Sequence, residues 1–240
     1  MTFWAAAATS GPALGPLVSG FSVPPENWRW SLWEILWVSG PVFLLLFFCL
    51  PQTSTPNILP RRARRLRNLT GNPRLRSQSE VVQSKLTVRE VANDAVWKPM
   101  QILIQDPAIM FAAVCTSLVY GIYYSFFEVF PLVYIGLYHL NFGQMGLAFL
   151  SIAVATALAI ITYFSYFYFI LEPNIKANGF GPPEQRLLSA LYGSFLLPTG
   201  LFLFGGTANG HIHWIVSVVC IGVYAFGVFI VLQCIFLYVP

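Results

Sequence analysis

Charged residues are scarce in this sequence, and two long stretches have almost none. Asp, Glu, Lys and Arg make up 9% of the 240 residues, whereas 57% are hydrophobic and 16% are aromatic. Glu128 is the single charged residue between Pro107 and Leu171, and none occurs from Leu187 to Pro240. A water-soluble domain of this length needs a charged surface that so few charges cannot supply. The composition therefore excludes an ordinary soluble protein and predicts an all-α membrane protein.

The sequence also lacks the patterns of disulfide frameworks, metal sites and common enzyme centres. Four cysteines form no CxxC pair and lie singly in apolar runs: Cys49, Cys115, Cys220 and Cys234. We interpret them as buried thiols. His211 and His213 have no third ligand near them in sequence, so no metal is expected there. No phosphate-binding glycine loop and no serine elbow is present. We therefore expect neither an enzyme nor a bound cofactor.

Six apolar segments are predicted to cross the membrane. They are roughly Thr2–Val23, Ser31–Leu50, Pro107–Phe130, Met145–Phe169, Leu187–Gly206 and Trp214–Val239. Each is long enough to span a hydrocarbon core of about 30 Å with some tilt. No basic residue precedes the first segment, so we interpret it as a mature helix rather than a signal peptide. The chain then divides into two helices in residues 1–50, a basic loop in 51–105 and four helices in 106–240.

The basic residues are concentrated on one predicted side of the membrane. Residues 51–105 hold ten of the thirteen and residues 172–186 hold two, whereas Arg29 is the one on the opposite side. Because cytoplasmic loops are enriched in Lys and Arg, residues 51–105 and both termini are predicted to be cytoplasmic. No address motif is visible. We expect the plasma membrane as the location, with the vacuolar membrane as the alternative.

Seven of the basic residues are arginines in "RRARRLRNLTGNPRLRSQSE", residues 61–80. Because predicted spans tether this segment on both sides, we expect a cytoplasmic helix that faces lipid and no nucleic-acid binding. Anionic lipid attracts each such arginine by about 1 kcal/mol. Arg74 and Arg76 precede Ser79 in a pattern that suits a basophilic kinase, and a phosphate there would weaken the attraction to lipid.

The first segment contains "SGPALGPLVSG", whose small residues let helix backbones approach closely in a membrane. It resembles the antiporter signature in the fifth helix of major facilitator transporters, Gly-x-x-x-Gly-Pro-x-x-Gly-Gly. Gly11, Gly15, Pro16 and Gly20 match this pattern, and Ser19 stands where the pattern has its penultimate glycine. The resemblance implies that these four residues pack helices together.

Two further stretches resemble the fungal 12-helix drug:proton antiporters, in their polyamine and multidrug branch. "LPQTSTPNILPRRARRLRNLTGN" is similar to the end of the sixth helix and the segment after it, with Gln52 in place of the usual glutamate. "DPAIMFAAVCTSLVYGIYYSFFEVFPLVY" is similar to the seventh helix. The resemblance implies a partial major facilitator fold with six transmembrane helices, equivalent to helices five to ten. It also implies transport of small cationic or amphipathic compounds, such as drugs or polyamines, in exchange for protons.

Two alternatives stay open at this point. Because helices one to four, eleven and twelve have no counterpart, the chain could be a non-transporting membrane remnant that at most associates with a full-length relative. Glycine faces such as that of Gly11 and Gly15 would then supply the packing surface. The other alternative is a membrane-tethered scaffold that works through residues 61–98.

Glu128 is the principal candidate for chemistry. A carboxylate in a spanning helix is costly, and it usually faces a cavity or a partner. Tyr120 and Tyr124 precede it by eight and four residues, and Tyr123 adjoins them. A carboxylate among aromatic faces suits a cationic substrate and could also carry the coupling proton. The alternative is a glutamate that anchors the helix end at the interface. Gln233 is a second candidate, which could instead bond a neighbouring helix.

Overall fold

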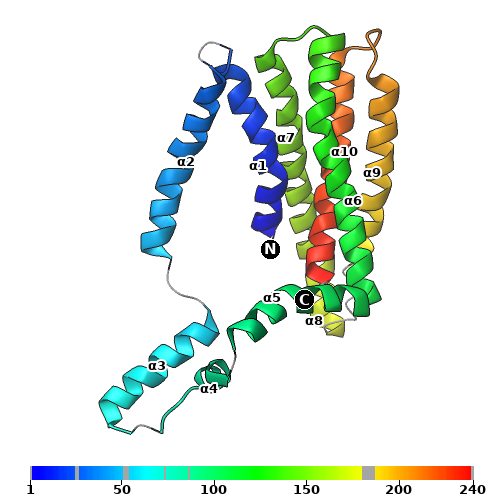
Figure 1. The fold of residues 1–240 in the computed structure, drawn as a ribbon. Helices are drawn as coiled ribbons and strands as arrows, with labels where there is room; N and C mark the ends of the chain where they lie inside the picture. The colour runs from blue at the N-terminus through cyan, green and yellow to red at the C-terminus, as the bar shows by residue number, and fades with distance from the viewer. Residues whose placement is uncertain are drawn as a thin grey trace. The chain divides into compact units, whose positions relative to one another are not determined.

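A computed structural model describes residues 2–24, 27–50, 54–72, 74–85, 87–179 and 187–238. The regular structure of these ranges is helical throughout, and they contain no strand, which confirms the predicted all-α class (Figure 1). The chain forms two compact units. One comprises Met1–Trp33 with Phe111–Pro240, and the other comprises Glu34–Met110.

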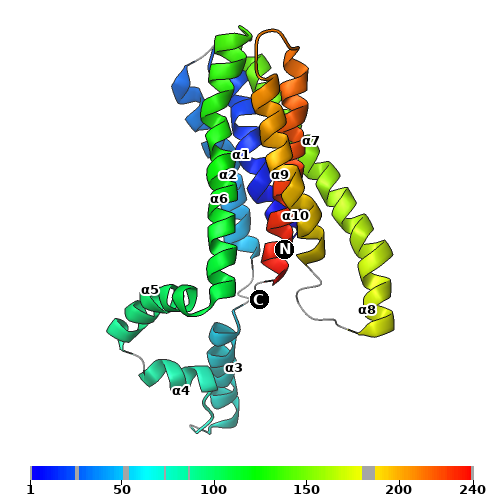
Figure 2. The same ribbon diagram turned by 90° about the vertical axis from the view of Figure 1, so that its right-hand side faces the viewer.

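The first unit is a bundle in which five long helices lie side by side (Figures 1 and 2). They are α1 (Thr2–Ser22), α6 (Pro107–Phe130), α7 (Phe142–Tyr166), α9 (Leu188–Thr207) and α10 (Trp214–Tyr238). A π-helical segment, η1 (Pro131–Leu137), extends α6, and another, η2 (Phe167–Leu171), connects α7 to the short helix α8 (Glu172–Asn178).

Local sequence signals explain where these helices begin. Asp106 accepts a hydrogen bond from the backbone N–H of Ala108 at 2.9 Å, so it caps α6, and Pro107 occupies the first helical position, where no N–H is needed. Asn141 and Gln144 form a capping box that starts α7 at Phe142. The predicted start at Met145 was therefore three residues late, because the apolar run begins after the cap.

Five helices in the described part are long and apolar enough to cross a membrane. They are Trp28–Cys49, Pro107–Leu137, Phe142–Ala177, Leu188–Thr207 and Trp214–Tyr238. The chain is thus a multi-pass integral membrane protein. The first predicted span, Thr2–Val23, also forms an uncharged helix, α1, at nearly the predicted bounds. Because of its glycine, proline, serine and threonine residues, α1 has a lower mean hydropathy than these five helices and is not among them. All six predicted spans are therefore helices of sufficient length, and five of them are also apolar enough to cross a membrane.

Aromatic side chains fill the core of the first unit between α6 and the other helices. The Phe126 ring lies 5.4 Å from the ring of Phe204 on α9 and 5.2 Å from that of Tyr224 on α10. The Phe130 ring lies 4.1 Å from that of Phe149 on α7. Because lipid tails are as apolar as these rings, close packing rather than transfer out of water favours this arrangement.

Small residues bring α9 and α10 close together. A Cβ atom added to Gly200 would lie 2.7 Å from the backbone nitrogen of Tyr224, and one added to Gly227 would lie 3.0 Å from the carbonyl oxygen of Gly193. Side chains at these positions would force the two backbones apart. The pair therefore uses the small-residue contact that is typical of membrane helices.

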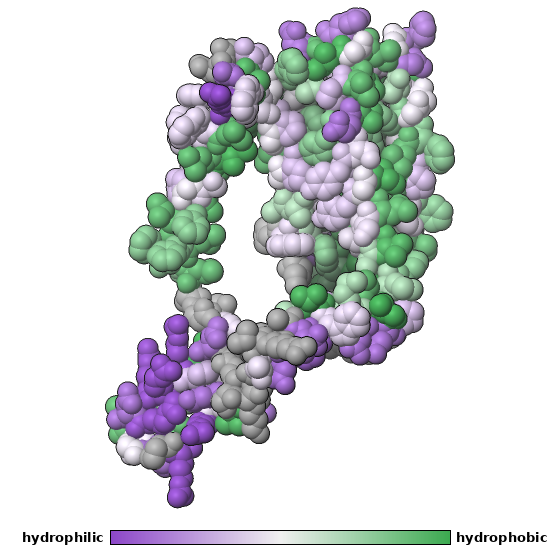
Figure 3. Space-filling view, viewed as in Figure 1, coloured by the Kyte–Doolittle hydropathy of each residue, from purple (hydrophilic) through white to green (hydrophobic). Residues whose placement is uncertain are grey.

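The second unit contains most of α2 (Trp28–Cys49) and the polar helices α3 (Thr55–Thr70), α4 (Gln78–Lys85) and α5 (Val88–Gln105). Five of the arginines lie on α3, which ends at Gly71 in the left-handed conformation, φ 64°. Figure 3 shows hydrophilic side chains gathered over α3.

The four cysteines are free thiols, but their burial differs. Cys220 and Cys234 are buried on α10, and Cys115 is half-buried. The interpretation of all four as buried thiols is wrong for Cys49, which is exposed. The reason is that α2 buries none of its described side chains.

Candidate functional site

Four polar or aromatic side chains form a stripe along one face of α6: Ser117, Tyr120, Tyr124 and Glu128. Their spacing of three, four and four residues places them one above another. The opposite face buries Val119, Tyr123, Phe126 and Phe130. Ser117, Tyr124 and Glu128 are exposed and Tyr120 is half-buried, so the stripe points away from the core of the first unit.

Aromatic rings continue this stripe as a ladder toward α7. The Tyr120 and Tyr124 rings are stacked with their centroids 6.2 Å apart, and Tyr124 and Phe127 are stacked at 5.7 Å. The Phe127 ring lies 5.2 Å from that of Phe149 on α7. Glu128 follows Tyr124 by one helical turn. A cation would find a negative charge and aromatic faces together on this surface.

Glu128 makes no ion pair within the ranges that the structure describes, whereas Arg67–Glu80, Lys98–Asp94 and Lys176–Glu172 are ion pairs there. A carboxylate and three hydroxyl groups are poor neighbours for lipid, because polar groups at membrane depth normally face a cavity or other protein. The stripe is therefore suited to a water-filled cavity or to a ligand.

Tyr123 does not join this stripe, although the sequence grouped it with Glu128. Its side chain is 1% exposed, and its hydroxyl donates a hydrogen bond to the carbonyl oxygen of Thr9 on α1 at 2.6 Å. The structure thus brings Tyr120 and Tyr124 to the face of Glu128 and places Tyr123 in the core. Ser117 was not singled out from the sequence, although its spacing of seven and eleven residues from Tyr124 and Glu128 could have identified it.

Gln233 is fully buried, with an exposed fraction of 0%. Its Nε2 donates a hydrogen bond to Thr2 Oγ1 at 2.9 Å, which links α10 to α1. Its Oε1 has no hydrogen-bond partner among the described residues. Glu128 lies near the end of α6 and Gln233 near the end of α10. Because these two helices run antiparallel (Figure 1), the two residues lie at opposite ends of the bundle. The structure therefore does not bring the two candidates into one site.

The antiporter-like segment packs α1 against α7. A Cβ atom on Gly20 would lie 2.7 Å from the carbonyl oxygen of Phe142, and one on Gly146 would lie 2.9 Å from the carbonyl oxygen of Pro16. Gly20 and Pro16 therefore lie at a close backbone contact, in which Gly146 is a partner that the sequence did not reveal. A Cβ atom on Gly11 or Gly15 would meet no atom of a described neighbour within 4 Å.

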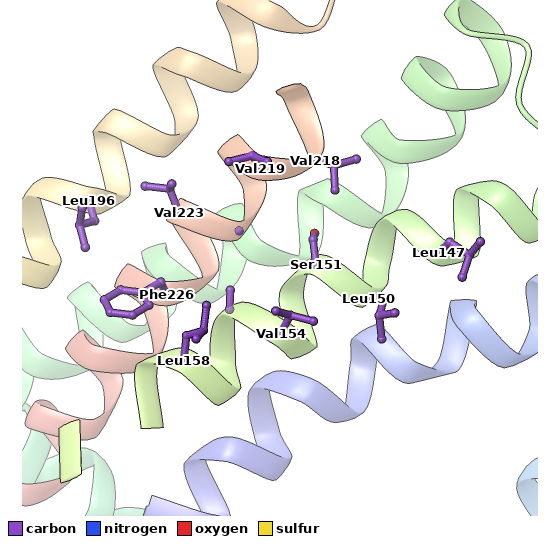
Figure 4. Close-up of a pocket in the computed structure, with 12 residues that line it drawn as sticks. Leu147, Leu150, Ser151, Val154, Leu158, Leu196, Val218, Val219, Val223 and Phe226 are labelled. Atoms are coloured by element: carbon purple, nitrogen blue, oxygen red, sulfur yellow. The ribbon is translucent and has the colours of Figure 1, made fainter. Parts of the chain in front are cut away.

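A groove of about 590 Å³ opens between α7 and α10, with α9 at one side (Figure 4). Its lining includes Leu150, Val154 and Phe226. Ser151 is the one polar side chain in the lining, and its Oγ already donates to the carbonyl oxygen of Ala148 at 2.8 Å. Binding sites need a few polar groups to orient a ligand. The groove suits lipid tails or an apolar helix better than a cationic compound.

Comparisons with known proteins agree with the helical architecture. The family model described as Major Facilitator Superfamily matches residues 1–240. The sequence is 45% identical over 236 residues to the MFS-type transporter pyvG of Aspergillus violaceofuscus, covering 98% of this chain and 43% of that protein. It is 33% identical to the cycloheximide resistance protein of Candida maltosa, covering 98% and 43%.

A third relative is the fluconazole resistance protein 1 of Saccharomyces cerevisiae, with 34% identity over 98% of this chain and 42% of that protein. The chain thus spans less than half the length of these curated relatives. No solved structure matches the sequence.

Proposed function

Because the chain belongs to the Major Facilitator Superfamily, we propose that it forms part of a transporter that exports small cationic or amphipathic compounds in exchange for protons. The observation that carries the proposal is the polar stripe of α6, which turns Glu128 and its tyrosines away from the core of the bundle. Major facilitator transporters act by moving two helical halves around a central site. A polar stripe that faces out of one half is suited to line such a site.

The names of the relatives support a small organic substrate. One is a cycloheximide resistance protein and another is a fluconazole resistance protein. Drug-like compounds are therefore the first substrate class to test. Polyamines are the second, because the Glu128 carboxylate beside the stacked rings of Tyr120 and Tyr124 offers ion pairing and cation–π attraction to a positively charged amine.

Glu128 is the residue to which we assign proton coupling. One carboxylate can hold either a proton or a cationic substrate, so binding of one would release the other. Tyr120 and Tyr124 would bind the substrate through their ring faces. Gln233 is assigned to the contact between α1 and α10 rather than to the substrate, since its amide already bonds Thr2.

Two exposed helix surfaces, on α2 and at Gly11 and Gly15 of α1, support the proposal that the chain is part of a longer transporter. None of the described side chains of α2 is buried, and a Cβ atom added to Gly11 or Gly15 would meet no described neighbour within 4 Å. In a longer transporter these faces would pack against further helices. The second candidate function, a non-transporting remnant that associates with a full-length relative, rests on the same two surfaces.

Export of a fluorescent cationic compound tests both candidates. A full-length transporter that contains this chain and residues 1–240 by themselves are each expressed in a drug-sensitive fungal strain. Export by the full-length transporter supports the role of the chain in transport. If the full-length transporter is present in the membrane and exports nothing, the transport proposal fails, and recovery of a full-length relative with residues 1–240 supports the remnant.

We further propose that residues 51–105 and both termini face the cytoplasm, and that the plasma membrane holds the protein. Ten of the thirteen basic residues lie in 51–105, and such residues are retained on the cytoplasmic side. A membrane-impermeant thiol reagent applied to intact cells tests this placement. A cysteine introduced at Ser77 should react only after the membrane is opened, and reaction in intact cells would reverse the topology.

A further inference from the structure

The connection between α3 and α4 places two serine hydroxyls beside an ion pair. Arg67 Nη2 on α3 lies 2.8 Å from Glu80 Oε1 on α4. The Oγ of Ser77 lies 3.2 Å from the Oγ of Ser79, and it also accepts a hydrogen bond from the backbone N–H of Glu80 at 3.2 Å. The hydrogen bond from Arg67, together with the charges of Arg67 and Arg76, lowers the pKa of the Glu80 carboxyl. This corner is thus rich in positive charge.

Ser79 follows two arginines at fixed distances in "RLRSQS". Arg74 stands five residues before it and Arg76 three residues before it, and both arginines are exposed. Guanidinium groups in such positions can each form paired hydrogen bonds with the carboxylates of a partner protein. Residues 75–77 lie outside any helix, and the side chains of Leu75 and Arg76 are exposed. A kinase that binds an extended segment can therefore contact them.

The structure around Ser79 is also easy to open. The helix α4 has eight residues, and helices shorter than about 12 to 15 residues are marginal by themselves in water. Ser79 lies in its first turn and is half-buried. Unwinding that turn breaks the hydrogen bond from the backbone N–H of Glu80 to the Oγ of Ser77 and exposes the Ser79 hydroxyl.

We propose that Ser79 is the acceptor for an arginine-directed serine/threonine kinase, and that its phosphate draws Arg67 away from Glu80 and weakens the attraction of α3 for anionic lipid. In the reaction, the Ser79 Oγ forms a bond to the γ-phosphorus of ATP as the bond to the bridging oxygen breaks. ADP leaves, and the hydroxyl proton passes to a base of the kinase. The inference rests on the proposed cytoplasmic placement of residues 51–105 and is independent of transport.

Two physical effects follow from the added phosphate. It brings a charge of about −1.5 to −2 into residues 61–80, whose other ionic groups are seven arginines and one glutamate. It also stands at the first turn of α4, where the helix dipole favours negative charge. The phosphate on Ser79 repels the Glu80 carboxylate beside it. Because the phosphate carries more negative charge than Glu80, it attracts Arg67 more strongly than Glu80 does. The arginines of α3 consequently hold less net positive charge for lipid.

Mapping the phosphate tests the site. The full chain in nanodiscs, in which both membrane faces are accessible, is incubated with ATP and a purified kinase that requires arginine five and three residues before its serine. We expect one phosphate, located on Ser79 by peptide mass spectrometry. Ser79→Ala should abolish it, the matched control Ser77→Ala should keep it, and Arg76→Gln should slow it roughly ten-fold, since the paired guanidinium contact is lost. No phosphate, or a phosphate on Ser77 instead, would overturn the assignment.

A second measurement tests the consequence for lipid. Hydrogen exchange of residues 61–67 is compared in nanodiscs of phosphatidylcholine with and without phosphatidylserine. Phosphatidylserine should protect these amides in the unmodified chain, and phosphorylation should reduce the lipid-dependent protection by roughly ten-fold, as expected for the loss of one to two charges of attraction. Equal protection before and after phosphorylation would overturn the proposed switch. Neither measurement depends on whether the chain transports anything.

Discussion

Tyr123 of α6 donates its hydroxyl hydrogen to the carbonyl oxygen of Thr9 of α1 across 2.6 Å, and the bond joins two helices through residues that are 114 positions apart in sequence. Both residues are buried, with exposed fractions of 1% and 2%. The bond fixes the rotation of α6 about its axis, since Tyr123 can reach Thr9 only when the opposite face, with Tyr124 and Glu128, points away from the core.

Loss of this hydroxyl should destabilise the bundle moderately. Tyr123→Phe removes the bond and keeps the ring, and side-chain hydrogen bonds in membrane proteins contribute about 0.6 kcal/mol on average, with a maximum of about 1.7. We expect Tyr123→Phe to lower the free energy of unfolding, measured in bicelles, by an amount within this range. Tyr124→Phe is the matched control, because that side chain is 53% exposed and outside the core. An equal effect of the two changes would contradict the account of α6.

The contact between α1 and α7 should tolerate no side chain at Gly146. Gly146→Val places atoms against the carbonyl oxygen of Pro16, which is backbone and cannot move without the helix. Overpacking of this kind costs about 1 to 3 kcal/mol. Gly11→Val is the control, since a Cβ atom at Gly11 meets no described neighbour within 4 Å. The melting temperature in detergent should fall for the first variant only, and similar melting of both would show that α1 does not pack as described.

Gln233 should behave as a helix contact rather than as a transport residue. Its Nε2 bonds Thr2, whereas its Oε1 has no partner in the described part of the chain. An unsatisfied buried group is unfavourable, so Gln233→Leu should change stability by less than about 1 kcal/mol, while Gln233→Ala leaves a cavity and costs about 2 or more. Unfolding in bicelles measures both. If Gln233→Leu is stable and yet abolishes export, Gln233 belongs to the transport site after all.

The ion pair between α3 and α4 should make their contact dependent on pH. The pKa of Glu80 is lowered from its ordinary value of 4.5, first by the hydrogen bond from Arg67. A depressed carboxyl pKa stabilises the folded form above the ordinary value, and this stabilisation is lost as the pH falls through the lowered pKa. Hydrogen exchange of residues 78–81 should therefore accelerate, relative to the intrinsic rate, below about pH 4.5. In Glu80→Gln this additional acceleration should be absent, and its persistence would point to another group.

Much of the fold was predictable because apolar length is a strong signal. The bounds of α6 agree with the predicted span, since Asp106 and Pro107 mark its start in the sequence itself. The glycine, proline, serine and threonine residues of α1 already indicated its weak apolarity in the sequence. We nevertheless predicted an ordinary span there because the segment is long enough to cross a membrane.

The site was less predictable, because the helices packed against α6 determine which of its side chains point into the core and which point out. Tyr123 and Tyr124 are adjacent and chemically identical, yet one is 1% exposed and the other 53%. The apolar spacing of Val119, Phe126 and Phe130 indicates the face to which Tyr123 belongs. The partners Thr9, Thr2 and Pro16 lie more than 100 residues from Tyr123, Gln233 and Gly146 in sequence, and no local pattern in one sequence reveals such pairs.

The most direct test of the account is proton-driven export by a full-length transporter that contains this chain, with Glu128 changed to Gln. Membrane vesicles with an imposed pH gradient report uptake of a labelled cationic compound, and Ser125→Ala, another exposed polar position on α6 outside the stripe, is the control. We expect Glu128→Gln to abolish uptake driven by the gradient while the amount of protein in the membrane stays the same, and Ser125→Ala to keep it. Gradient-driven uptake at the unmodified rate in Glu128→Gln would contradict the central claim and leave Glu128 as an interfacial anchor.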